Sequence, residues 1–193
     1  MGRRDVPELA LVLVVELSDL GRLFARARDL TSHTEYVVVG SLCVLGIIRG
    51  KNVPPRMLMS IDVDCYTKAD PGRIFELKAA LGEGSSFESE NGFYLDPISP
   101  DLPTLPSGWE SRLVRVPLDN GVVVHFLDAN DAAVSKYARN EPRDREWIQA
   151  GLEATLLSAP VIESRFRQTD FFDDRERDMA RKALEEDRVA SGR

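Results

Sequence analysis

The chain has 193 residues, which is enough for one domain, alone or with a helical appendage. Its hydrophobic content of 43% is ordinary for a globular protein, and its net charge of −7 argues against sequence-independent binding of polyanions by the whole surface. Cys43 and Cys65 both lie in apolar segments. We therefore expect buried free thiols rather than a disulfide or a zinc site.

The N-terminal part of the chain contains an apolar run at residues 9–15, bracketed by Glu8, Glu16 and Asp19. This run is far shorter than the ~20 residues that a membrane span needs. We therefore predict a cytoplasmic protein with no membrane partner. Leucine, phenylalanine and alanine recur at three- and four-residue spacing, and this pattern predicts one helix over residues 6–30.

The next segment, residues 36–41, is a β-branched run that ends in Gly40-Ser41. Such a run predicts a buried strand that stops at a close backbone approach. Residues 42–48 then predict a helix that begins at Gly40-Ser41. Because the N-terminus of a helix has free N–H groups and a partial positive charge, this turn is a candidate phosphate site.

A second strand, predicted over residues 58–66, carries Asp62 and Asp64. Residues i and i+2 of a strand point to one face, so both carboxylates should converge. Two adjacent carboxylates are unfavourable unless a cation neutralises them, and oxygen-only ligation suits Mg²⁺ that carries the phosphates of a nucleotide. The alternative is an exposed strand whose acids are solvated while the alternate apolar residues face inward.

Strand and helix signals continue to the end of the chain. The segment 119–121, Asp-Asn-Gly, predicts a hairpin, and Asp128 is expected to cap the helix that follows. We predict strands at 92–97, 112–117 and 122–127, helices at 70–82, from 128, at 142–152, from 158 and at 173–190, and loops at 82–92 and 97–108.

These elements predict an α/β (α+β) fold in which a small mixed sheet is flanked by helices. The predicted organisation is an N-terminal helix (1–34), a central domain (35–155) and a C-terminal helical extension (156–193).

The order of these features resembles nucleotidyltransferases of the DNA polymerase β superfamily. The shared features are a strand that ends in Gly40-Ser41, a helix, and then Asp62-x-Asp64 on the next strand. Within that superfamily, the chain more closely resembles small bacterial nucleotidyltransferase-like domains related to AbiE-type and MenT-type toxins, over about residues 35–150. The resemblance implies a nucleotidyltransferase fold, an NTP substrate bound by Gly40 and Ser41, and Mg²⁺ held by Asp62 and Asp64.

In the toxin relatives, a lysine on a helix and an aspartate shortly after it complete the site. Residues 131–136 and 143–147 resemble these two pieces. The resemblance implies that Lys136 contacts the triphosphate and that Asp144 orients the triphosphate or the lysine. A lysine beside a carboxylate is suited to neutralise phosphate charge during transfer. The alternative is a plain ion pair between adjacent helices.

The chain departs from the superfamily pattern at the third carboxylate, which usually lies on a later strand. The strand predicted at 122–126 has no acid before Asp128. Either Asp128 supplies the third carboxylate, His125 substitutes for it, or one metal suffices.

Two functions follow from these observations. The first is Mg²⁺-dependent transfer of a nucleotide from an NTP to RNA, most readily the tRNA 3′ end, or to a protein, as the toxin of a toxin–antitoxin system. The second is a catalytically silent domain that acts by binding, as an antitoxin or regulatory partner. The acidic net charge favours a protein partner over RNA.

Overall fold

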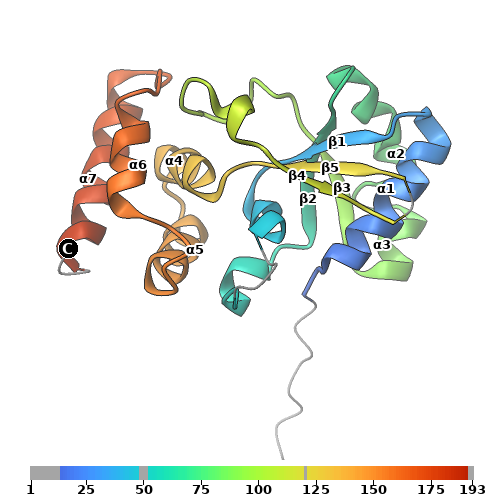
Figure 1. Cartoon of the computed structure of the whole chain (residues 1–193), viewed down its shortest axis with the longest axis horizontal. Coiled ribbons are helices and arrows are strands. Elements are labelled where there is room, and N and C mark those ends of the chain that lie inside the picture. Colours follow the sequence, from blue (N-terminus) through green and yellow to red (C-terminus); the bar gives the residue numbers. More distant parts are fainter. Residues whose placement is uncertain (1–13, 48–51, 120, 191–193) are drawn as a thin grey trace, which may run out of the picture.

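The computed structural model describes residues 14–47, 52–119 and 121–190. Figure 1 shows a sheet with helices beside it and a separate group of helices towards the C-terminus. The elements are α1 (Leu17–Thr31), β1 (Glu35–Val38), η1 (Ser41–Ile47), η2 (Pro55–Leu58), β2 (Asp62–Thr67), η3 (Pro71–Leu77), α2 (Lys78–Leu81), α3 (Ser86–Asn91), β3 (Tyr94–Pro97), η4 (Trp109–Arg112), β4 (Val114–Pro117), β5 (Val123–Phe126), α4 (Ala129–Arg139), α5 (Pro142–Glu153), α6 (Ala159–Phe166) and α7 (Asp174–Ala190), where η denotes a 3₁₀ helix.

A five-stranded mixed sheet in the order β3-β2-β1-β5-β4 organises the described residues. β1 pairs with β5 in parallel and with β2 antiparallel, while β3 is parallel to β2 and β4 is antiparallel to β5. The C-terminal end of β1 therefore lies beside the N-terminal ends of β2 and β3. The predicted α/β class with a small mixed sheet is confirmed.

The interior of the sheet explains the central strands. Tyr36, Val37 and Val38 of β1 are at most 1% exposed, so a β-branched and aromatic run is buried on both faces. Helix α1 covers one face, where Phe24 stacks on Tyr36 with ring centroids 4.5 Å apart. This packing accounts for the apolar spacing that predicted a helix near the N-terminus.

The boundaries of that helix differ from the prediction over residues 6–30. Residues 1–13 lie outside the described residues, and residues 14–16 are not helical. The helix begins at Leu17 because Glu16 and Asp19 form a reciprocal capping box, in which the Glu16 N–H donates to Asp19 Oδ2 at 2.8 Å.

Two further local predictions are corrected. The strand predicted over 58–66 begins only at Asp62, because two prolines start the 3₁₀ helix η2 at residue 55. The predicted loop at 82–92 contains α3, whose N-cap Ser85 accepts a hydrogen bond from the Glu88 N–H at 3.2 Å. By contrast, the β4–β5 hairpin and the Asp128 cap of α4 are confirmed.

The C-terminal helices pack on α4, which joins them to the sheet. Asp131 of α4 is fully buried and pairs with Arg112 at 2.7 Å and with Arg165 of α6 at 3.1 Å. Asp187 of α7 accepts a hydrogen bond from Tyr137 at 2.8 Å. These contacts hold α6 and α7 against α4. Among the helices of the described ranges, none combines the length and apolar composition that a membrane span requires.

Candidate active site

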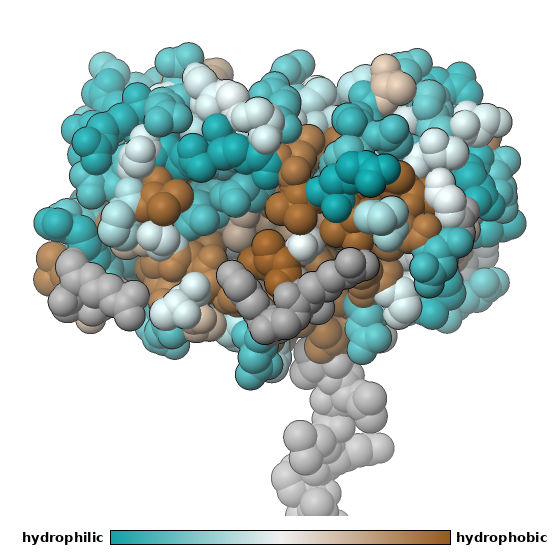
Figure 2. Space-filling model, viewed as in Figure 1, coloured by the Kyte–Doolittle hydropathy of each residue, from teal (hydrophilic) through white to brown (hydrophobic). Residues whose placement is uncertain are grey.

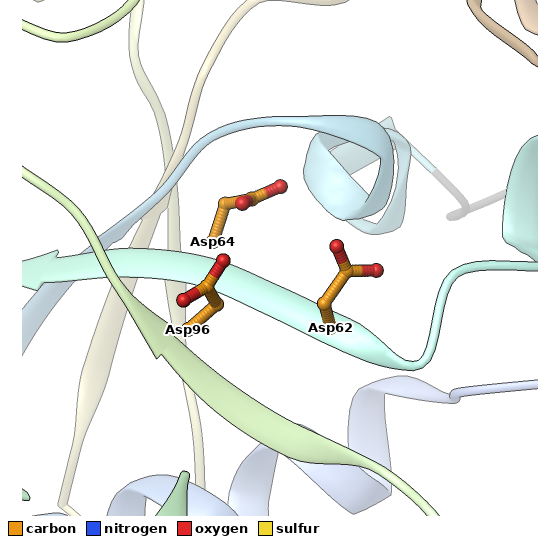
Figure 3. Close-up of side chains that lie close together, drawn as sticks. All are labelled: Asp62, Asp64 and Asp96. Atoms are coloured by element: carbon orange, nitrogen blue, oxygen red, sulfur yellow. The ribbon is translucent and has the colours of Figure 1, made fainter. Parts of the chain in front are cut away.

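Three carboxylates converge near the N-terminal ends of β2 and β3, beside the C-terminal end of β1. Asp62 and Asp64 lie on β2, and Asp96 lies on β3, directly opposite Asp64 in the parallel register. One oxygen from each carboxylate lies within 4.8 Å of the others. Figure 3 shows the three side chains on the same side of the two strands, pointing toward one another. Three acids at this separation form a ligand set suited to a divalent cation.

The electrostatics of this cluster are those of an excess negative charge. Burial, followed by repulsion from Asp62 and Asp96, raises the pKa of Asp64 to about 7. Burial and the charge of Asp62 also raise the pKa of Asp96. Ser60 donates a hydrogen bond to Asp62. Ionising all three carboxylates is therefore costly unless a cation joins them.

The Gly40 bend lies against this cluster. Gly40 has a φ of +63°, a conformation that favours glycine, and a Cβ at this position would overlap the Asp64 carboxylate. The chain then enters η1 at Ser41, and Figure 3 shows this helix facing the acids. The bend and the carboxylates thus lie together, as the sequence predicts, and the acids do not face open solvent on the other side of the sheet.

A second group of charges lies on α4 and α5, next to Ser41. The Lys136 ammonium donates to Ser41 Oγ at 3.0 Å and to Asp144 Oδ1 at 3.0 Å. Arg139 donates to both oxygens of Asp144, at 2.7 and 2.6 Å. Burial alone would raise the pKa of Asp144, but the hydrogen bonds and charges of Arg139 and Lys136 outweigh it and lower that pKa.

The ring of Trp147 fixes the position of Lys136. The ammonium lies 4.9 Å from the ring centroid, within the range of a cation–π contact. The indole N–H donates to the carbonyl oxygens of Ser41 and Met57, each at 3.2 Å. Trp147 therefore ties α5 to the first turn of η1 and keeps the lysine beside Ser41.

A cleft of about 390 Å³ lies beside these groups, between the sheet and the C-terminal helices. Its walls include Gly40, Asp64, Lys136 and Arg139, so the bend, one carboxylate and both cations face one space. The volume lies in the range of small-molecule sites, ~300–1,000 Å³. Figure 2, which has the orientation of Figure 1, shows hydrophobic residues exposed across the middle of the molecule.

The structure brings together the residues that the sequence singled out. Gly40, Ser41 and Asp64 lie at the bend, Asp62 lies beside Asp64, and Lys136 reaches Ser41 while pairing with Asp144. The ion pair of the alternative interpretation thus exists, but its lysine also faces the cleft.

The expected position of the third carboxylate was wrong. The cluster contains Asp96 of β3, and neither Asp128 nor His125 belongs to it. Asp128 caps α4, and His125 bonds to Glu35 at 2.7 Å. The sequence did not indicate Asp96, because the superfamily pattern places the third carboxylate on a later strand such as β5, whereas the strand beside β2 that carries the acid is β3. The acid inside the predicted strand 92–97 was the available signal.

Arg139 was also missed by sequence reasoning. It lies one turn after Lys136 on α4, so its spacing places both cations on one face of the helix. Its side chain is 49% exposed and lines the cleft, whereas the Asp144 side chain that binds it is fully buried.

A mixed sheet whose first strand leads into Gly40-Ser41, and whose next two strands carry three converging carboxylates, is consistent with a nucleotidyltransferase-like domain. A family model described as "Nucleotidyltransferase of unknown function (DUF6036)" matches residues 18–189. Because this match spans most of the 193 residues, the chain belongs to that family. Searches of curated proteins and of solved structures gave no match.

Proposed function

We propose that the protein transfers a nucleotide from an NTP to an acceptor hydroxyl with the help of Mg²⁺. The observation that carries the proposal is the convergence of Asp62, Asp64 and Asp96 beside the Gly40-Ser41 bend, across one cleft from Lys136. A cluster of three acids on one side, and the buried Lys136 with the half-exposed Arg139 on the other, match the charges of a metal-bound triphosphate.

The carboxylate cluster fits a divalent cation. Its donors are all oxygens, and burial together with the charges of Asp62 and Asp96 raises the pKa of Asp64, so a bound cation would stabilise the ionised cluster. Asp62, Asp64 and Asp96 would hold Mg²⁺, which supplies polarisation of the α-phosphate and neutralisation of the leaving group when bound.

The other side chains position the triphosphate. Lys136 and the Ser41 hydroxyl, 3.0 Å apart, would donate to the β- and γ-phosphates, together with the backbone near Gly40. Arg139 adds a second cation at the cleft. Asp144 acts as a positioning residue, since its two oxygens hold Lys136 and Arg139 at fixed sites.

In this proposal the nucleotide binds in the cleft, and the acceptor binds on the side of the carboxylate cluster that faces away from the cleft. Asp64 lines the cleft, but Asp62 and Asp96 do not, so the acceptor approaches from their side. The acceptor oxygen bonds to the α-phosphorus, and the bond to pyrophosphate breaks with its electron pair leaving on the pyrophosphate oxygen. The carboxylate of Asp96 takes the proton of the acceptor hydroxyl.

For the acceptor we retain RNA, with the tRNA 3′ end as the first candidate, or a protein side chain, in a cytoplasmic toxin of a toxin–antitoxin pair. The relationship to AbiE-type and MenT-type toxins belongs to this proposal. The net charge of −7 supports a second candidate, a catalytically silent domain that binds a protein partner as an antitoxin or regulator.

The test is incubation of the full chain with Mg²⁺, each of four α-labelled NTPs, and either total tRNA or a protein extract. We expect labelled acceptor with the parent protein and none with Asp64→Asn. Asp70→Asn, at an exposed aspartate outside the cluster, is the matched control and should label normally. Absence of labelling on every acceptor would overturn the enzymatic proposal in favour of the binding protein.

A further inference from the structure

The cleft extends beyond the groups that the proposed chemistry uses. From Gly40, Asp64 and Lys136 it continues to Thr104, in the segment between β3 and η4, and to Glu176 near the start of α7. Its remaining walls are mostly apolar, with side chains such as Ile98, Leu102, Pro103 and Leu127, and include the polar Ser135 and Arg139. An apolar slot with polar groups at both ends suits a flat aromatic ring attached to a charged group.

Glu176 is held in a defined orientation. Its Oε1 accepts a hydrogen bond from the Thr104 hydroxyl at 3.1 Å, and its Oε2 accepts one from the Phe172 N–H at 2.7 Å. The Glu176 N–H donates to Asp173 Oδ1 at 2.7 Å, which fixes the backbone of the same turn. A carboxylate has about four acceptor positions, so one remains on each oxygen.

Two adjacent acceptor positions discriminate among nucleobases. The hydrogen-bonding edge of guanine carries two neighbouring donors, the ring N1–H and the exocyclic amino group. Adenine and cytosine carry one amino donor beside a ring acceptor, and uracil carries one ring N–H between two carbonyl groups. A carboxylate only accepts hydrogen bonds, so it pairs with guanine through two bonds and faces an acceptor on each of the other bases.

We propose that this end of the cleft is a guanine-selective base site in which Glu176, oriented by Thr104, reads the base of the bound nucleotide. The inference rests on the proposed function, because it takes the triphosphate to lie at the Gly40 and Lys136 end. It deepens that function by naming the substrate class, a guanine nucleoside triphosphate.

The experiment measures binding of GTP, ATP, CTP and UTP to the full chain with Mg²⁺ by calorimetry, without an acceptor. We expect GTP to bind at least about tenfold more tightly than each of the others, since two charge-assisted hydrogen bonds distinguish it. In Glu176→Gln, an amide N–H replaces one acceptor, so the GTP advantage should disappear. Glu185→Gln makes the same change on α7 away from the cleft and should keep the parent preference.

A second variant guards against an effect of Glu176→Gln on folding. Thr104→Val removes the hydroxyl that orients Glu176 Oε1 and should reduce the GTP preference by a few-fold while the circular dichroism spectrum stays that of the parent. Equal affinity for the four nucleotides, or a GTP preference that survives in Glu176→Gln, would overturn base selection. Equal affinity combined with acceptor labelling would leave the proposed function standing, whereas binding of none of the four would overturn both.

Discussion

Two groups of charged residues each contribute side chains to the walls of one cleft, Asp64 from the first and Lys136 and Arg139 from the second. In the first group, one oxygen each of Asp62, Asp64 and Asp96 lies within 4.8 Å of the others, and burial, followed by repulsion from Asp62 and Asp96, raises the pKa of Asp64 to about 7. In the second, Asp144 is fully buried but binds both Lys136 and Arg139, and its pKa is lowered. The carboxylates of the first group are partly buried and that of the second is fully buried, yet only Asp144 forms ion pairs with cations of the chain.

The difference separates a structural cluster from a ligand site. A fold that needed only stability would not retain three acids that repel one another, because replacing one by its amide would relieve the repulsion. The cluster around Asp144 holds its own cations, whereas the cluster of Asp62, Asp64 and Asp96 has the negative charge that the proposed cation would neutralise. In the proposed function the two groups would divide the work of binding a metal-bound triphosphate, and changes in each should have different consequences.

The largest expected effect is the loss of transfer in Asp96→Asn. The substitution removes one cation ligand and the proposed proton acceptor, so we expect transfer to fall by about 10³-fold or more while the fold is retained. The measurement is the initial rate of acceptor labelling with α-labelled NTP. Asp119→Asn, at an exposed position beside the β4–β5 turn, is the control. A rate within a few-fold of the parent would show that Asp96 is not part of the machinery.

Changing the cluster around Asp144 should cost stability as well as binding. Lys136→Met removes a cation that is 4% exposed and leaves Asp144 with Arg139 alone, so we expect a loss of about 2–3 kcal/mol in the free energy of unfolding. Nucleotide affinity should fall too, because a phosphate donor is lost. Urea denaturation and calorimetry measure the two effects, with exposed Lys182→Met as control. Unchanged affinity would reduce Lys136 to the ion pair alone.

The cluster of Asp62, Asp64 and Asp96 should give the protein a distinctive dependence on pH. Because the pKa of Asp64 is higher in the folded state than in the unfolded chain, the native state binds this proton more tightly. Its contribution to the free energy of unfolding should therefore fall as pH rises from about 4 to about 7, by an amount on the order of 4 kcal/mol. The measurement is urea denaturation in EDTA from pH 4 to 8, taken as the difference between the parent and Asp64→Asn.

Most substitutions destabilise a protein, but above pH 7 we expect Asp64→Asn to raise the free energy of unfolding. Asp64→Asn should be more stable than the parent in EDTA, because the repulsion with Asp62 and Asp96 is removed. A constant difference between the two proteins across the pH range would contradict the account of the cluster.

The smallest expected effect is that of Arg139→Gln. The Arg139 side chain is half exposed, so its pair with Asp144 is screened by solvent, and we expect a loss of about 1 kcal/mol in the free energy of unfolding. Its effect on nucleotide affinity should be larger in proportion, about tenfold, because the guanidinium lines the cleft. Arg143→Gln, on an exposed arginine of α5, should change neither quantity. A stability loss without a change in affinity would make Arg139 purely structural.

Much of this fold could be predicted from the sequence because local signals agree with the packing. The buried run of β1, the Asp-x-Asp of β2 and the hairpin before β5 each depend on residues close together in the chain. Their period and turn chemistry predict them, and the position of Gly40 beside Asp64 follows from the antiparallel pairing of β1 and β2.

The remaining features depend on pairings between distant segments. Nothing in the residues around Asp96 shows that β3 lies parallel to β2, and that register decides which acid joins the cluster. The contact of Arg139 with Asp144 requires the angle between α4 and α5, and the contact of Thr104 with Glu176 joins segments 72 residues apart. Tertiary packing sets these three contacts, so the pattern of a single segment could not predict them.

The central claim is that the three acids form a cation site, and calorimetric titration of the metal-free protein with Mn²⁺ at pH 8 tests it most directly. The account predicts one bound ion for the parent protein, with affinity reduced at least about tenfold in Asp62→Asn, Asp64→Asn and Asp96→Asn alike, and unchanged in Asp119→Asn. Equal affinity in the parent and all three cluster variants, or no binding by the parent, would contradict it.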